Sequence, residues 1–132
     1  MIWFLRLLFS AIIGAMLWVT TWASLTEALG DFAAGPVIRN PWVVATLFDA
    51  YFAFISVYVW IAWKEQSLGA RILWFIAVIL LGNLAIGAYF LGELFKIPAS
   101  GPLTEVFATR RPGRLTFPGI LVALSIGVYL LA

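Results

Sequence analysis

Few side chains in this sequence could do chemistry, and one of them lies inside an apolar run. Asp49 lies eight residues after Pro41, which is about 12 Å along a helix beginning at that proline. A carboxylate at such a depth in a bilayer costs about 2.5–3.5 kcal/mol on insertion scales, so it needs a partner or a proton. Two interpretations stay open. Asp49 is either a site residue facing a cavity, or a group that bonds another helix or pairs with Arg39.

Other polar side chains join Asp49 if successive apolar runs cross a membrane in alternating directions. Asn83 then lies near the middle of the third run, and Gly87 follows one turn later. A small residue beside a polar one is typical of close helix packing in lipid. The candidate polar cluster inside the membrane consists of Thr20, Thr21, Asp49, Asn83 and Tyr89. It is either a pocket or a packing contact that holds three helices in register.

Three arginines, Arg110, Arg111 and Arg114, come just before the last apolar run. They are candidate contacts for lipid headgroups or for an acidic partner. Against an anionic leaflet each arginine would contribute about 1 kcal/mol.

The absence of cysteine and histidine excludes several classes of site. Disulfides, thiol chemistry, cysteine or histidine metal sites, histidine-ligated haem and histidine-held chlorophyll all need these residues. General acid–base catalysis needs a second positioned group, and the sequence offers no paired carboxylates. We therefore predict no enzyme, metal or cofactor, although a bound lipid, quinone or carotenoid is compatible with the composition. The net charge of +2 is too small to indicate a nucleic-acid partner, so none is predicted.

The elements that position these residues are four long apolar runs. Hydrophobic residues make up 64% of the chain and charged residues 11%, whereas soluble domains average about 45–50% and 25%. Runs of about 20 apolar residues predict membrane-spanning helices. The sequence therefore predicts an all-α polytopic membrane protein with a single domain over 1–132 and a three-helix core plus one added helix. The four expected transmembrane helices cover about 1–25, 41–63, 72–95 and 115–132. The first run is too long for a signal peptide, so it is expected to stay as a membrane helix.

Four alternating crossings divide the basic residues between two faces. One face would carry Arg6, Lys64 and Arg71, and the other Arg39, Lys96, Arg110, Arg111 and Arg114. The positive-inside rule then favours cytoplasmic loops at 26–40 and 96–114, by five cations to three. The expected location is a bacterial inner or intracytoplasmic membrane.

Several strings, taken in order and spacing, resemble a known family. They are TTWAS from Thr20, PWVVATLFDAYF from Pro41, WIAWKE from Trp60 and LLGNLA from Leu80. The chain is similar over about residues 18–95 to small bacterial and plant membrane proteins that form a domain of unknown function. The proline-rich connection and the last run depart from that family. The resemblance implies helices and draws attention to Asp49 and Asn83, but it implies no activity.

Two functions fit this sequence. The first is a structural or accessory subunit of a larger membrane complex of respiratory or photosynthetic type, because the connections are short and redox ligands are lacking. Its partners would be membrane lipids and other membrane protein subunits. The alternative is a carrier or binding protein for a small lipophilic molecule, with Asp49 as the group for proton coupling.

Overall fold

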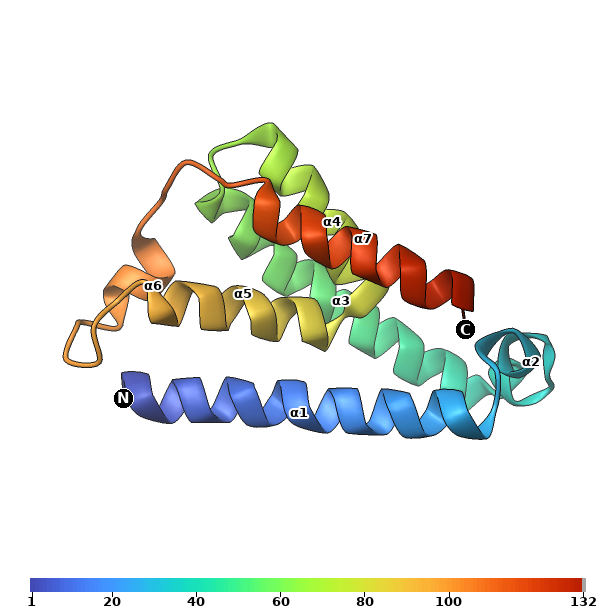
Figure 1. Cartoon of the computed structure of the whole chain (residues 1–132). Coiled ribbons are helices and arrows are strands. Elements are labelled where there is room, and N and C mark those ends of the chain that lie inside the picture. The colour runs from blue at the N-terminus through green and yellow to red at the C-terminus, as the bar shows by residue number, and fades with distance from the viewer. Residues whose placement is uncertain (132) are drawn as a thin grey trace.

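The computed structural model describes residues 1–131, and most of this part of the chain is helical. The prediction of an all-helical fold is confirmed. Five helices exceed ten residues: α1 (Ile2–Thr26), α3 (Pro41–Lys64), α4 (Leu68–Leu81), α5 (Asn83–Phe95) and α7 (Thr116–Leu131). Shorter helices lie in the connections: α2 (Leu29–Ala34), the 3₁₀ helix η1 (Val37–Arg39) and α6 (Thr104–Ala108). Figure 1 shows their arrangement.

Within residues 1–131, two helices, α1 and α3, are long and apolar enough to cross a membrane. Their 25 and 24 residues correspond to about 37 and 36 Å, which exceeds the roughly 30 Å of a hydrocarbon core. They cover the first and second expected helices to within two residues. The start of α3 is set by Asn40, whose side chain accepts a hydrogen bond from the Trp42 amide.

The single helix expected over 72–95 is wrong, because the chain reverses at Gly82. Gly82 has φ 53° and ψ −122°, a conformation that only glycine adopts readily. It separates α4 from α5, and α5 runs back toward the start of α4 (Figure 1). In the single helix expected from residue 72, Tyr89 would lie about 26 Å along the axis from the end that adjoins the link carrying Glu65. Instead, the Tyr89 hydroxyl donates a 2.8 Å hydrogen bond to Glu65 Oε1.

Two tyrosines donate hydrogen bonds to backbone carbonyls at the end of α4, where the break at Gly82 interrupts the helix. The last carbonyls of a helix lack partners within the helix. Tyr51 of α3 donates to the Ile79 carbonyl at 3.3 Å, and Tyr129 of α7 donates to the Leu80 carbonyl at 2.6 Å. The chain therefore satisfies the end of α4 with its own side chains.

The core lies between α3, α4, α5 and α7. Its buried members are Ile61, Ala70, Trp74, Ala77, Val78, Ala85, Ile86, Tyr89 and Val122. Because α7 packs along α4 and contributes Val122, it is part of the core rather than an added helix. The 16 residues of α7 span about 24 Å, less than α1 or α3. Helix α1 packs along α5, where Phe9 stacks on Phe90 at 4.5 Å between ring centroids.

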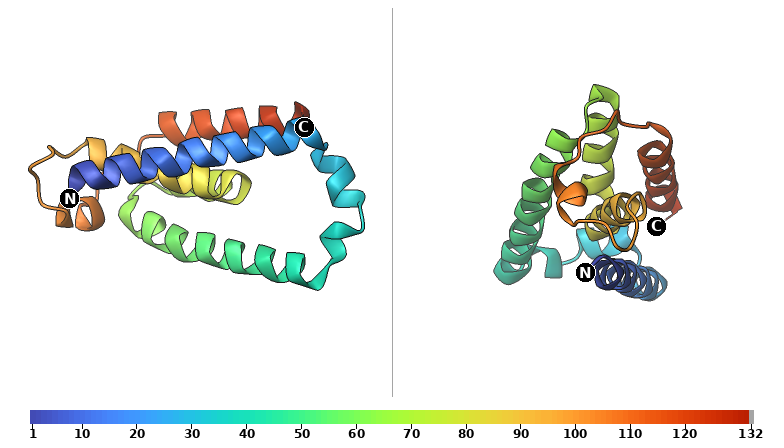
Figure 2. Two further views of the ribbon diagram at one scale, coloured as in Figure 1. Left: turned by 90° about the horizontal axis from the view of Figure 1, so that it is seen from below. Right: turned by 90° about the vertical axis from the view of Figure 1, so that its left-hand side faces the viewer.

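The reversal at Gly82 also changes which connections lie together. Arg6 donates to the Leu94 and Ile97 carbonyls at 3.0 and 2.7 Å, so the connection 96–114 lies at the end where α1 begins. The connection 26–40 lies at the opposite end (Figures 1 and 2). The prediction that the connections 26–40 and 96–114 lie on the same face is therefore wrong. Seven of the eight Lys and Arg residues gather at what we call the basic end: Arg6, Lys64, Arg71, Lys96, Arg110, Arg111 and Arg114.

Candidate functional site

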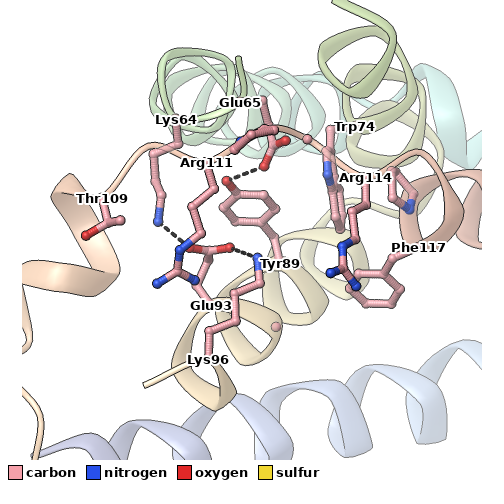
Figure 3. A pocket seen from close by; sticks show the side chains of 14 residues that line it. Lys64, Glu65, Trp74, Tyr89, Glu93, Lys96, Thr109, Arg111, Arg114 and Phe117 are labelled. Atoms are coloured by element: carbon pink, nitrogen blue, oxygen red, sulfur yellow. Dashed lines mark hydrogen bonds and ion pairs between the residues drawn. The ribbon is translucent and has the colours of Figure 1, made fainter. Parts of the chain in front are cut away.

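A cavity of about 840 Å³ lies at the basic end, within the range of roughly 300–1,000 Å³ that is typical of ligand sites. It is an open cavity bordered by the link between α3 and α4, by α5, and by the chain from Thr109 to Pro118 (Figure 3). Its lining side chains are Lys64, Glu65, Trp74, Tyr89, Gly92, Glu93, Lys96, Thr109, Arg111, Pro112, Gly113, Arg114, Phe117 and Pro118.

A buried ionic network forms one wall. Lys64 is 2% exposed and Glu93 5%, and Lys64 Nζ lies 2.5 Å from Glu93 Oε2. Lys64 also donates to the Val106 carbonyl, and Lys96 donates to the second oxygen of Glu93 at 2.5 Å. Burial alone would raise the pKa of the Glu93 carboxyl, but the hydrogen bonds from the two lysines outweigh it and hold the pKa below its usual range. Glu93 is therefore a carboxylate with both oxygens occupied.

Tyr89 and Glu65 form a second buried pair. Tyr89 is 3% exposed, and Trp74 and Trp60 meet its ring edge-to-face at 4.8 and 5.6 Å between centroids. Burial and then the neighbouring Glu65 carboxylate raise the pKa of the Tyr89 hydroxyl, so it stays protonated as a donor. This pair fixes α5 against the link between α3 and α4.

The chain from Thr109 to Arg114 passes close to that link. The backbones of Arg111 and Glu65 form an isolated parallel β-bridge. A side chain at Gly113 would overlap Ala70 and the Glu65 carboxylate, so only glycine fits this approach. Arg110 donates from Nε to the Trp63 carbonyl at 2.8 Å, and its guanidinium lies 5.4 Å from the Trp63 ring centre. Arg110 therefore anchors the segment from which Arg111 and Arg114 extend.

Arg111 and Arg114 are the two cations of the lining that have no partner among the residues that the structure describes. Neither guanidinium makes a hydrogen bond or ion pair within residues 1–131, whereas Lys64 and Lys96 are both bonded to Glu93. Figure 3 shows both arginine side chains extending from the same segment along the cavity lining. An aromatic wall lies beside them, where Trp74 meets Phe117 edge-to-face at 5.5 Å. The cavity thus combines two guanidinium groups that make no hydrogen bond or ion pair within residues 1–131 with an apolar surface.

The structure brings only one member of the expected polar cluster into this cavity. Tyr89 lines it, but Thr20, Thr21, Asp49 and Asn83 are exposed and make no side-chain hydrogen bond to one another. Thr20 donates to the Met16 carbonyl of its own helix at 2.6 Å. The cluster fails to form because α5 reverses and carries Tyr89 back to the basic end. Asn83, expected at mid-helix, is the first residue of α5.

Sequence reasoning missed Lys64, Glu65, Glu93 and Lys96 as site residues. Each lies at the end of an apolar run, where charges usually serve as interfacial anchors. Two features of the sequence could have indicated them. Lys64 and Glu65 are adjacent at the end of the apolar run of α3, and Glu93 and Lys96 are three residues apart, which is the spacing of an ion pair on a helix.

Comparison with curated proteins and with solved structures gave no match for this chain. A family model described as "Protein of unknown function (DUF1475)" matches residues 1–111. The match includes α1 to α6, so the expectation that the proline-rich connection departs from the family is wrong up to residue 111, whereas α7 lies outside as expected. The resemblance seen in the sequence is thereby confirmed, and the chain belongs to the DUF1475 family of proteins of unknown function.

Proposed function

We propose that this protein is an integral membrane protein that binds an anionic amphiphile in the cavity at the basic end. The observation that carries the proposal is the pair of unpartnered guanidiniums of Arg111 and Arg114 beside the wall of Trp74 and Phe117. The long apolar helices α1 and α3 support the membrane location, for which we propose a bacterial inner or intracytoplasmic membrane. This role is binding, not catalysis.

The chemistry of the lining favours a ligand with a charged head and an apolar body. Guanidinium groups bind phosphate and carboxylate oxygens through two parallel hydrogen bonds. Arg111 and Arg114 have donors available for such a headgroup, because within residues 1–131 they bond no acceptor. Phe117, which is 43% exposed, offers apolar area for a hydrocarbon chain, and the buried Trp74 packs edge-to-face behind it. Asp49 does not line this cavity, so the proposal does not use it.

The test is lipid binding by the purified protein in a neutral detergent, followed by native mass spectrometry during titration with phosphatidylglycerol and phosphatidylcholine. The wild-type protein should bind the anionic lipid more tightly. The double variant Arg111→Gln/Arg114→Gln should bind it about tenfold or more weakly, because charge-assisted hydrogen bonds contribute about 1.5–3 kcal/mol each.

Arg39→Gln is the matched control, because Arg39 is the one basic residue at the opposite end of the part of the chain that the structure describes. It makes the same type of substitution, removes one positive charge where the double variant removes two, and should leave binding unchanged. Equal loss of binding in the control and the double variant would show that overall charge, not the cavity, attracts the lipid. Equal affinity for the two lipids would contradict the proposal directly.

A second candidate function is an accessory subunit of a larger membrane complex, and Asp49 favours it. Asp49 is exposed on an apolar helix and makes no hydrogen bond or ion pair within residues 1–131. In a bilayer such a carboxylate requires a partner from outside the chain or a proton. A basic or hydroxyl-bearing side chain of another subunit would supply that partner.

Purification of the tagged protein from its native membrane in a mild detergent tests this second function. A stoichiometric partner should co-purify with the wild type and be reduced with Asp49→Ala. Thr46→Ala is the control, because Thr46 is also exposed on α3 but bonds the Trp42 carbonyl of its own helix. A wild-type chain that purifies alone would leave lipid binding as the proposed role.

A further inference from the structure

We infer that the basic end faces the cytoplasm and that α4 and α5 form a re-entrant hairpin, which enters the membrane from that side and returns to it. The chain would then cross outward with α1 and inward with α3. Helix α4 would descend into the bilayer, Gly82 would turn the chain, and α5 would bring it back. Helix α7 would then run toward the outer face.

The distribution of charge supports this orientation. Seven of the eight Lys and Arg residues lie at the basic end, and Arg39 of η1 lies at the opposite end, in the same connection as Glu27 at the end of α1 and Asp31 of α2. Cytoplasmic loops of membrane proteins carry an excess of Lys and Arg, and short loops near the helix ends set the orientation. The alternating topology expected from sequence divided these cations five to three, whereas the observed fold divides them seven to one.

The lengths of α4 and α5 support a re-entrant path. Their 14 and 13 residues span about 21 and 20 Å, which is shorter than the roughly 30 Å of a hydrocarbon core. Both ends of the hairpin meet at the basic end, where Tyr89 bonds Glu65 and Lys64 pairs with Glu93. A chain that entered and left on opposite sides could not make these contacts.

The turn itself is built for surroundings without water. Irregular backbone at membrane depth is tolerated only where protein buries it or where it lines an aqueous cavity. Gly82 is buried, and the Ile79 and Leu80 carbonyls accept hydrogen bonds from Tyr51 and Tyr129. In an aqueous setting, solvent would satisfy these carbonyls without help from two other helices.

This orientation places the cavity in the cytoplasmic leaflet. That consequence for the ligand rests on the proposed function, but the orientation and the hairpin do not. Loss of lipid selectivity in the binding experiment would overturn the proposed function alone. The labelling experiment below tests the topology alone.

The chain contains no cysteine, so single cysteines report their own positions. Three exposed connection residues and one exposed residue of the turn are suitable: Ala33→Cys, Gln66→Cys, Ser100→Cys and Asn83→Cys. Each variant is produced in a bacterial host and treated with a membrane-impermeant maleimide in right-side-out and in inverted inner-membrane vesicles. Labelling after detergent solubilisation confirms that each cysteine is reactive.

The expected result is labelling of residues 66 and 100 only in inverted vesicles, of residue 33 only in right-side-out vesicles, and of residue 83 in neither. Labelling of 66 and 100 from opposite sides would restore the four-crossing topology and overturn the hairpin. Labelling of 66 and 100 only from outside would overturn the orientation. Reaction at residue 83 in either vesicle type would show that the turn is not embedded.

Discussion

The Tyr89 hydroxyl bonds the Glu65 carboxylate at 2.8 Å, although the two residues lie 24 positions apart on either side of the turn at Gly82. This bond closes the hairpin of α4 and α5 at the basic end. The hairpin supplies a wall of the cavity. The turn at Gly82 is therefore needed to bring Tyr89 and Glu93 of α5 to the cavity at the basic end.

Replacing Gly82 with alanine should destabilise the fold by about 2 kcal/mol or more. The positive φ is strained for any residue with a side chain, by about 1–3 kcal/mol. An added Cβ would also lie 2.7 Å from the Phe54 ring. Thermal unfolding in detergent, followed by circular dichroism, measures the loss.

Gly14→Ala is the control for this substitution, because an added Cβ at Gly14 of α1 meets nothing within 4 Å. It should leave stability unchanged or raise it slightly, since alanine favours a helix over glycine by about 1 kcal/mol. A similar melting temperature for the two variants would contradict the strained turn.

Removing the tyrosine hydroxyls that bond the end of α4 should have graded effects. Tyr129→Phe leaves the Leu80 carbonyl without its 2.6 Å partner and should cost about 1–2 kcal/mol. Tyr51→Phe removes a longer bond of 3.3 Å and should cost less. Both variants keep the ring, so unfolding measurements isolate the hydroxyl. The reverse order of stability would show that these bonds do not support the turn.

Breaking the buried ion pair should cost far more than breaking the exposed one. Glu93→Gln leaves the amino group of Lys64, which is 2% exposed, without its counter-charge, and such losses cost about 3–5 kcal/mol. Lys96→Gln removes the other partner of Glu93, but the Lys96 side chain is 49% exposed and its loss should cost less than about 1 kcal/mol. Chemical denaturation of both variants gives the comparison, and equal losses would contradict it.

The depressed pKa of Glu93 predicts a loss of stability in acid. The pKa of Glu93 in the folded chain lies below its ordinary value of 4.5, so the unfolded chain takes up this proton first. The stabilisation is therefore present above about pH 4.5 and is lost as the pH falls through the folded-state pKa. Between pH 7 and pH 3, the difference in melting temperature between the wild type and Glu93→Gln should shrink as the pH falls. A constant difference across this range would assign the acid sensitivity to other groups.

Two helices could be predicted closely from the sequence because local signals define them. Pro41 follows the capping residue Asn40, and the apolar run of α3 ends at Lys64. The hairpin could not be predicted, because Gly82 lies within an apolar run, where an isolated glycine is tolerated in a helix. Its turn depends on Phe54, Tyr51 and Tyr129, which come from two other helices.

The same limit applies to the site. Arg111 and Arg114 could be identified as candidate contacts because they form a local basic cluster before an apolar run. The pairing of Lys64 with Glu93 could not, because it requires α5 to run toward the basic end. Asp49 and Asn83 attracted attention for their apparent depth, yet both lie outside the cavity.

The hydrogen bonds of Arg6 can form only late in the synthesis of the chain. Its guanidinium bonds the carbonyls of Leu94 and Ile97, which are 88 and 91 positions later in the chain. At about 5–20 residues per second, a ribosome needs roughly 5–20 s to make the intervening segment. Helix α1 is therefore synthesised long before its final contacts exist. Assembly of the basic end is therefore a late event, and a truncated nascent chain that stops before Leu94 lacks the carbonyl acceptors that Arg6 of α1 uses.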